Sequence, residues 1–437
     1  MVPMKSMKKI KLKLILIFLS IAHFICLNLE AKSNYDHNSE PLVSKKEAAI
    51  LNEVSELAKT DILKAIDLIT GKIYKDSSSA LDFTAANLYF QNNNFNEAKH
   101  YYQQALQKRP MFNRAKENLV RILIQEESYA PAFSILNDII NSNQSDHGNL
   151  LLMGFVLMQM DKICAAKTIY NQAILKDPDE IQAYLGLAKC LLLQERNAEA
   201  IPVLREILSL NPLKKDIWSL LSNCYMANDK LDKAISTLET SKILKIIDEK
   251  GLITLGDLYL NQNQVDDALD IFKQCLNKEN VEVSRLIRAV NGFVLLEEYK
   301  KAQIFLEKIL KSKTPLDNTY LEKIDFLQAK IFFHQGKSEE ALVLYLKVLK
   351  RNPLNGECLI SIGDLYLFKK KPVKARISFE RAASLKNFKQ KALVKLALLE
   401  VELKHFDQAL QLLEKAQNIK YEQYIANYVN RLKMLLL

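Results

Sequence analysis

Apolar residues recur along this chain of 437 residues at steps of three and four positions, with polar residues between them. These steps place the apolar side chains on one face of a helix and the polar ones on the other, so the pattern predicts a succession of amphipathic α-helices. No stretch alternates apolar and polar residues in the way that is typical of a strand. The sequence therefore predicts an all-α protein.

One alanine marks a regular period in this succession of helices. Ten such alanines follow one another with a constant period of about 34 residues, and only the interval between Ala302 and Ala341 is longer. A fixed period of this length is typical of a chain built from one repeated pair of helices, which stacks into a solenoid. The ten residues are Ala98, Ala132, Ala166, Ala200, Ala234, Ala268, Ala302, Ala341, Ala375 and Ala409.

Numbering each repeat so that this alanine is position 20 aligns the other positions. Position 8 is small in most repeats, for example Ala86 and Gly154, whereas position 24 is large, for example Tyr102 and Tyr170. Two helices pack closely only where small side chains let their backbones approach, so we expect positions 8 and 20 at the crossing of antiparallel helices. Proline at position 32, as at Pro178, ends the second helix in four repeats because it cannot continue a helix interior.

This order of large, small, aromatic, alanine, aromatic, alanine and proline positions resembles the tetratricopeptide repeat family. The resemblance covers about four fifths of the chain and implies a right-handed superhelical α-solenoid of helical hairpins. Two features depart from the family: only Trp218 supplies its tryptophan at position 4, and position 27 is alanine in only some repeats. The ten repeats start near residues 79, 113, 147, 181, 215, 249, 283, 322, 356 and 390.

The segments outside the repeats complete the expected organisation. Residues 45–78 contain a helical pair with poor register, introduced by a capping-box pattern at Ser44 to Glu47. Residues 311–321 hold the five extra residues of the long interval and are expected to form a lengthened turn. The predicted order is a leader (1–31), a polar linker (32–44), a degenerate helical pair acting as an N-terminal cap (45–78), ten repeats (79–423) and a C-terminal capping helix (424–437).

The leader, residues 1–31, has the composition of an export signal. Five lysines between Lys5 and Lys13 precede an apolar run from Leu14 to Leu29, an order that is typical of a signal peptide. The run is long for a cleaved signal and short for a membrane span, so a cleaved signal peptide, an uncleaved membrane anchor and a coincidental apolar segment stay open. The first two alternatives predict an exported protein, periplasmic or envelope-associated, that is either secreted or membrane-anchored.

Composition and motifs argue against several function classes. The net charge of +10 is a mild excess without a basic stripe, so nucleic-acid binding is not expected. The five cysteines beyond the leader form no CxxC pair, and the six histidines are scattered, so no metal or cofactor is expected. Cys190 and Cys224 are interpreted as buried thiols that are too far apart for a disulfide. Because no catalytic constellation is found, the chain is predicted not to be an enzyme.

The family resemblance implies a binding surface on the first helix of each repeat, along positions 2, 5, 9, 12 and 13. Position 12 is apolar in all ten repeats, whereas position 9 is mixed. Two interpretations stay open: these residues pack against neighbouring first helices, or they form an apolar groove with a central polar row that binds a partner segment. The candidate groove residues are Phe83, Asn87, Phe90, Arg121, Ile124, Leu151, Phe155, Met158, Leu185, Lys189, Asn223, Met226, Ile253, Asp257, Leu260, Asn291, Phe326, Lys330, Phe333 and Asp364.

These expectations lead to a functional hypothesis. The chain is interpreted as a non-enzymatic scaffold that acts outside the cytoplasm and binds a segment of a partner protein in its concave groove, in envelope assembly, secretion or polysaccharide export. The alternative is a module that regulates a separate glycan-active enzyme, presents substrate to it, or binds polysaccharide directly. Membrane attachment through residues 1–31 follows if the leader is retained, and the sequence specifies neither the partner nor the oligomeric state.

Overall fold

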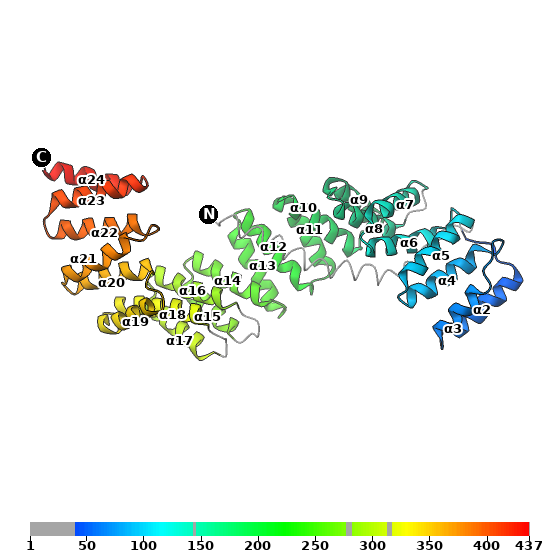
Figure 1. Ribbon diagram of the computed structural model, residues 1–437, viewed down its shortest axis with the longest axis horizontal. Helices are drawn as coiled ribbons and strands as arrows, with labels where there is room; N and C mark the ends of the chain where they lie inside the picture. The colour runs from blue at the N-terminus through cyan, green and yellow to red at the C-terminus, as the bar shows by residue number, and fades with distance from the viewer. Residues whose placement is uncertain (1–39, 143–145, 277–281, 313–316, 437) are drawn as a thin grey trace. The chain divides into compact units, whose positions relative to one another are not determined.

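The structure is a computed structural model that describes residues 40–142, 146–276, 282–312 and 317–436 (Figure 1). These residues form 23 helices and no strand, so the predicted all-α fold is confirmed. None of the helices in these ranges is both long and apolar enough to cross a membrane. The predicted leader and most of the predicted linker lie outside the described residues. The described residues divide into two compact parts, one up to residue 229 and one from residue 230, and each is described by itself.

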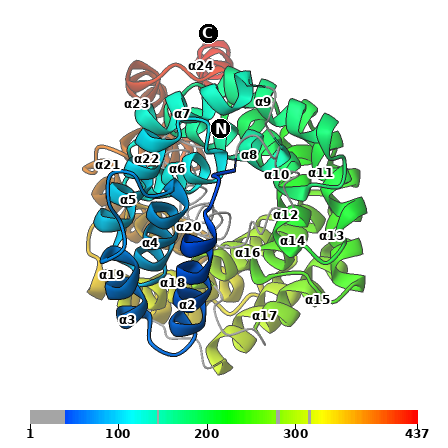
Figure 2. The same ribbon diagram turned by 90° about the vertical axis from the view of Figure 1, so that its right-hand side faces the viewer.

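In the N-terminal part, successive helices from α2 to α12 pack against one another, and Figure 2 shows α8 to α11 following one another in this way. Two first helices of neighbouring repeats, α8 and α10, also touch. The helices are α2 (Lys45–Ala58), α3 (Ile62–Thr70), α4 (Ser79–Gln91), α5 (Phe95–Lys108), α6 (Asn113–Gln125), α7 (Tyr129–Asn141), α8 (His147–Gln159), α9 (Ile163–Lys176), α10 (Ile181–Leu193), α11 (Asn197–Leu210) and α12 (Lys215–Ala227).

The C-terminal part continues the same packing, with first helices α14, α16, α18, α20 and α22 touching in that order. Its helices are α13 (Leu231–Ile243), α14 (Glu249–Asn261), α15 (Val265–Cys275), α16 (Val283–Leu295), α17 (Tyr299–Lys311), α18 (Asn318–His334), α19 (Ser338–Arg351), α20 (Gly356–Phe368), α21 (Pro372–Ala383), α22 (Lys389–Glu402), α23 (Phe406–Ile419) and α24 (Gln423–Leu436).

The first helices begin where the repeat register places them, with two exceptions. Helices α4, α6, α8, α10, α12, α14, α16 and α20 start at the residues given by the register, whereas α22 starts one residue early. Helix α18 starts at Asn318, four residues before the expected start near 322, because the side chain of Asp317 accepts a hydrogen bond from the N–H of Tyr320 at 2.8 Å. Part of the segment expected as a lengthened turn therefore adds a helical turn to α18.

The seam between the two helices of a hairpin is closed by the small residues. All ten alanines at position 20 have an exposed fraction of 0%. A Cβ atom on Gly154 would lie 2.7 Å from the ring of Tyr170, and one on Gly256 would lie 2.6 Å from the ring of Phe272. Position 24 thus occupies the space that the missing side chain at position 8 leaves open, as close packing requires.

The turn inside each hairpin has one residue in the left-handed backbone region. It is position 15 in every repeat, with φ from 53° to 65° in nine repeats and 79° at Gly336 in the eighth. Its N–H donates to a carbonyl at the end of the first helix, as Asn93 does to Phe90 at 3.0 Å. The backbone conformation is therefore common to all the turns, although glycine, which adopts it most readily, occupies only one of them.

Candidate protein-binding site

The first helices of repeats 8, 9 and 10, in the C-terminal part, line a pocket of about 240 Å³. Helices α18, α20 and α22 supply the lining from positions 2, 5, 6, 9, 12 and 13, and α19 supplies Tyr345. All of these first-helix positions except 6 were predicted to line the groove. The lining residues are Lys330, Phe333, His334, Tyr345, Glu357, Ile360, Ser361, Asp364, Lys391 and Lys395.

Two ion pairs cross this pocket between neighbouring helices. Nζ of Lys330 lies 3.0 Å from Oε1 of Glu357, which joins α18 to α20. Nζ of Lys395 lies 2.8 Å and 2.9 Å from the two carboxylate oxygens of Asp364, which joins α22 to α20. With Lys391, the lining carries three lysines and two carboxylates, so the pocket favours a ligand with a small negative charge.

The apolar part of the pocket comes from aromatic and aliphatic side chains. Tyr345 and Ile360 are only 1% and 3% exposed, and burial raises the pKa of Tyr345 above its usual range, so its hydroxyl stays protonated. Phe333 meets the ring of Phe368 edge to face at 5.7 Å, and Lys330 lies 4.7 Å from the ring centre of Phe326. These contacts hold Phe333 and Lys330 in place beside the opening.

The polar row at position 9 makes contacts between repeats. In the N-terminal part, Oδ1 of Asn87 accepts hydrogen bonds from the hydroxyl of Tyr102 at 2.5 Å and from Nδ2 of Asn118 at 3.1 Å. In the C-terminal part, Oδ2 of Asp257 accepts from Arg285 at 3.0 Å and from Arg288 at 2.7 Å. Together with the pair Asp364–Lys395, this gives three places where position 9 contacts position 6 of the next repeat.

Comparison with known families decides what these hairpins are. Models described as tetratricopeptide repeat match residues 83–146, 151–213 and 326–392, residues 191–242, and residues 252–279, which together make up more than half of the chain. The protein belongs to the tetratricopeptide repeat (TPR) family. TPR proteins generally bind other proteins, so these repeats suggest a protein-interaction scaffold.

Individual relatives of this TPR protein are distant. It is 22% identical to the protein O-mannosyl-transferase TMTC3 of Homo sapiens over 77% of this chain and 39% of that protein. It is 23% identical to the DnaJ homolog subfamily C member 3 of Gallus gallus over 53% of this chain and 51% of that protein. The chain thus spans about two fifths and about half of the length of these relatives.

Solved TPR structures are similar over part of the chain. YrrB, described as a TPR protein with an unusual peptide-binding site, aligns with 41% of this chain and 89% of its own at 18% identity and a TM-score of 0.35. A TPR protein from Parabacteroides merdae aligns with 58% of this chain and 98% of its own at 15% identity and a TM-score of 0.42.

The described structure corrects part of the predicted groove of this TPR protein. Five predicted groove residues are at most 7% exposed and belong to the core: Phe83, Ile124, Leu151, Leu185 and Ile253. The reason is that these side chains turn toward neighbouring helices, as the ring of Phe83 does when it packs 4.8 Å from that of Phe112.

The other fifteen predicted groove residues are at least partly accessible. Asn223 is exposed, and fourteen are half-buried: Asn87, Phe90, Arg121, Phe155, Met158, Lys189, Met226, Asp257, Leu260, Asn291, Phe326, Lys330, Phe333 and Asp364. Only Lys330, Phe333 and Asp364 of this set line the pocket. Asn87 and Asp257, which were predicted to belong to the central polar row of the groove, are hydrogen-bonded within the TPR protein.

Sequence reasoning missed the charged residues that complete the pocket. Lys391 and Lys395 come from positions 2 and 6 of repeat 10, and position 6 had not been assigned to the groove. The signal that could have found Lys395 is the opposite charge at position 9 of the repeat before it, Asp364, because the same relation links Asp257 to Arg288. Neighbouring repeats must therefore be read together.

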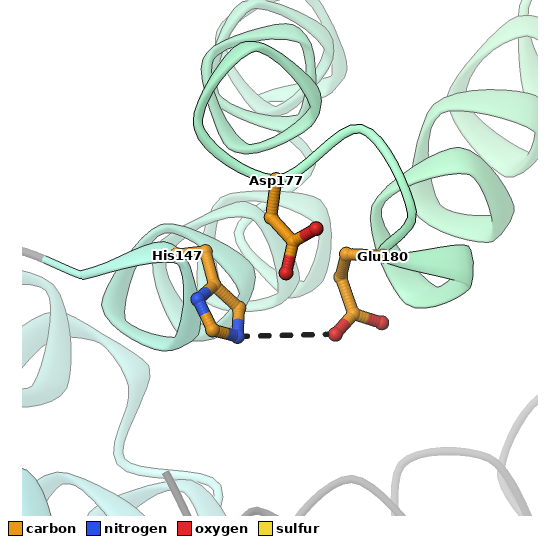
Figure 3. A group of neighbouring side chains, drawn as sticks. All are labelled: His147, Asp177 and Glu180. Atoms are coloured by element: carbon orange, nitrogen blue, oxygen red, sulfur yellow. Dashed lines mark ion pairs between the residues drawn. The ribbon is translucent and has the colours of Figure 1, made fainter. Parts of the chain in front are cut away.

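No cysteine is among the residues that line this pocket. Cys190 and Cys224 are buried free thiols, as expected, and burial raises their pKa to about 12 and about 11. Such thiols are poor nucleophiles and poor metal ligands at neutral pH. Among the described residues, one cluster of side chains could hold a metal ion. It consists of His147, Asp177 and Glu180, in the N-terminal part (Figure 3).

Proposed function

We propose that this TPR protein is a non-enzymatic scaffold that binds a segment of a partner protein along the first helices of repeats 8 to 10. The observation that carries the proposal is the pocket of about 240 Å³ whose lining combines paired charges with apolar surface. Sites of this kind bury one side chain of a ligand and orient the rest through a few polar contacts.

The lining defines the chemistry of the proposed partner segment. An aliphatic or aromatic side chain enters against Phe333 and Ile360, and a carboxylate lies near Lys391 and Lys330. Because Lys330 and Lys395 are already paired, a partner carboxylate gains most from Lys391, which is exposed at the start of α22. The segment is therefore apolar with an acidic neighbour.

A matched pair of charge reversals tests this proposal. Lys391→Glu places a negative charge at the pocket, whereas Lys389→Glu places the same charge two residues away on an exposed position of α22 that does not line the pocket. We expect Lys391→Glu to weaken binding of the partner at least about tenfold and Lys389→Glu to leave it nearly unchanged, since one close charge pair contributes about 1–2 kcal/mol. Equal effects of the two reversals would contradict the proposal.

Crosslinking identifies the partner and tests the location independently. A photoreactive phenylalanine analogue at Phe333 is compared with one at Val343, which is 65% exposed on α19 and does not line the pocket. The partner used in the charge-reversal test is the protein that the Phe333 probe captures and the Val343 probe does not. If only the Val343 probe captures a protein in cells, the binding surface lies on another face.

We further propose that the protein acts outside the cytoplasm, in envelope assembly, secretion or polysaccharide export. The support is the basic head and apolar run of residues 1–31, and residues 1–31 attach the protein to the membrane if they are retained. Fractionation with N-terminal sequencing tests this: an exported chain that begins near residue 32 is a cleaved product, and an exported chain that keeps its leader is anchored. A chain found only in the cytoplasm would contradict export.

The second candidate is a module that serves a glycan-active enzyme or binds polysaccharide. It is favoured by the similarity to a relative that is named a protein O-mannosyl-transferase, of which the alignment covers 39%. Direct glycan binding requires accessible aromatic rings, and here Phe90, Phe155 and Phe326 are only half-buried. Saturable binding of envelope glycans to the purified chain, lost in Phe326→Ala, would favour this candidate over the protein scaffold.

A further inference from the structure

A histidine and two carboxylates of repeat 3 converge in the N-terminal part (Figure 3). His147 is the first residue of α8, Asp177 directly follows α9, and Glu180 directly precedes α10. One possible ligand atom of each residue lies within 4.8 Å of those of the other two. Nε2 of His147 is 3.9 Å from Oε2 of Glu180. Three ligands from three chain segments thus face one point.

The hairpin itself brings these residues together, because they occupy positions 1, 31 and 34 of one repeat. The same positions meet in repeat 8, where Oε1 of Glu322 accepts from Nδ2 of Asn352 at 3.1 Å and from Nδ2 of Asn355 at 2.9 Å. The repeat register therefore brings the side chains of positions 1, 31 and 34 together, and the residue types decide what they can bind. Repeat 8 has two amides and one carboxylate at these positions, whereas repeat 3 has an imidazole and two carboxylates.

Backbone groups hold both carboxylates of repeat 3 in orientation. Oε1 of Glu180 accepts from the N–H of Gln182 at 2.8 Å, and Oδ1 of Asp177 accepts from the N–H of Asp179 at 3.2 Å. In each carboxylate, one oxygen is held by a backbone N–H and the other oxygen remains for another partner. Hydrogen bonds from surrounding groups orient metal ligands in the same way. The side chains of His147 and Glu180 are 31% and 20% exposed, so an ion can enter and keep a water ligand.

We propose that His147, Asp177 and Glu180 bind one Zn²⁺ ion. Imidazole nitrogen with two carboxylate oxygens and an open position suits Zn²⁺, whereas Ca²⁺ and Mg²⁺ prefer oxygen ligands only. Ligand atoms on a tetrahedral Zn²⁺ lie about 3.4 Å apart, so the separation of 3.9 Å between His147 and Glu180 needs only a small side-chain movement. The ion ties the turn after α9 to the start of α8. This site is separate from the proposed protein-binding pocket and does not depend on it.

Calorimetric titration of the metal-free, untagged full chain with Zn²⁺ tests the proposal. The titration uses a Cys164→Ser background, because Cys164 is an exposed thiol that could bind Zn²⁺ by itself. We expect one Zn²⁺ per chain, and at least about tenfold weaker binding in each of His147→Ala, Asp177→Asn and Glu180→Gln. His100→Ala removes an exposed histidine elsewhere and leaves the affinity unchanged. Circular dichroism of each metal-free variant verifies that it is folded.

Three results would overturn the proposal. They are the absence of saturable Zn²⁺ binding, Zn²⁺ binding that His147→Ala does not weaken, and Ca²⁺ binding as tight as that of Zn²⁺, which would indicate a site without preference for Zn²⁺. A transplant tests the register: Glu322→His, Asn352→Asp and Asn355→Glu together place the same ligands in repeat 8 and raise the stoichiometry from one to two. A folded triple variant that still binds one ion would contradict the argument from equivalent positions.

Discussion

The seam inside each hairpin and the position-9 row on the first helices follow opposite rules. At the seam, position 20 is alanine in every repeat and fully buried. In the row, position 9 changes from asparagine to lysine to aspartate, and its contacts change with it, from Asn87–Asn118 to Asp257–Arg288. At the seam, close packing allows only one residue type at position 20. At position 9, which is half-exposed in most repeats, any pair of residues is accepted if its polar atoms are hydrogen-bonded.

This difference indicates where stability and where function reside. Replacing seam residues changes packing that no water can compensate, so large effects on the free energy of unfolding are expected there. The row is partly solvated, so its pairs contribute little to stability, and a partner that binds there competes with these pairs for the same polar atoms. Four tests sharpen this contrast, from the largest expected effect to the smallest.

The largest effect is expected at the seam of repeat 9. Phe379 is 0% exposed and its ring occupies the space beside Gly363. Phe379→Ala leaves a cavity there, so we expect a loss of about 3–5 kcal/mol in the free energy of unfolding, measured by urea denaturation. The control is Phe368→Ala, because Phe368 is 66% exposed. Equal losses in the two variants would remove the distinction between seam and surface.

A smaller effect is expected at Glu400, a carboxylate at position 11 that is 0% exposed. Burial alone would raise the pKa of Glu400. Pairing with Arg376 and with Nδ1 of His405 at 2.9 Å outweighs burial, so the pKa lies below its ordinary value. Glu400→Gln should cost about 1.5–3 kcal/mol at pH 7.

The pH dependence of Glu400 follows from the sign of its shift. A lowered pKa in the folded state stabilises the fold above pH 4.5, and this contribution is lost as the pH falls through the lower folded value. The difference in unfolding free energy between wild type and Glu400→Gln should therefore shrink between pH 6 and pH 3. Glu402→Gln, on an exposed residue two positions later, serves as the control. A difference that stays constant with pH would exclude the ion pair as its source.

The turns should show a backbone effect of about 1–2 kcal/mol. Gly336 has φ +79° and nothing within 4 Å of a Cβ placed on it, so Gly336→Ala costs only the left-handed conformation of alanine, about 1–2 kcal/mol. Gly336→Asn should cost less, because asparagine tolerates this region. Thermal unfolding ranks the two variants, and a smaller loss for alanine than for asparagine would contradict the backbone explanation.

The smallest effect is expected in the position-9 row. Asp257 is paired with Arg285 and Arg288, but its side chain is 26% exposed and that of Arg288 is 60% exposed. A double-mutant cycle of Asp257→Asn and Arg288→Gln should give a coupling free energy of about 0.2–1 kcal/mol that decreases with added salt. A coupling free energy as large as the loss in Phe379→Ala would show that the row, too, is a structural element.

The sequence by itself determined the number of repeats, the place of most helix starts and the residues of the seam. It could do so because a hairpin is closed by residues less than one period apart, and steric fit repeats the same residue types at the same positions. The predicted start of α18 was wrong because the side chain of Asp317 caps this helix through a local hydrogen bond, and the repeat period gives no information about such a bond.

Only the tertiary structure decided which first-helix residues are accessible and which residues distant in the sequence lie close together. Position 5 is apolar whether it lines a groove or packs in the core, and the structure buries it at Leu151 and Ile253. His147 and Glu180 are the first and the last residue of repeat 3, and they meet only because the turn after α9 returns to the start of α8. The burial of a side chain and the geometry of a ligand set depend on the segments that pack beside it. The pattern of residues along one segment therefore cannot predict them.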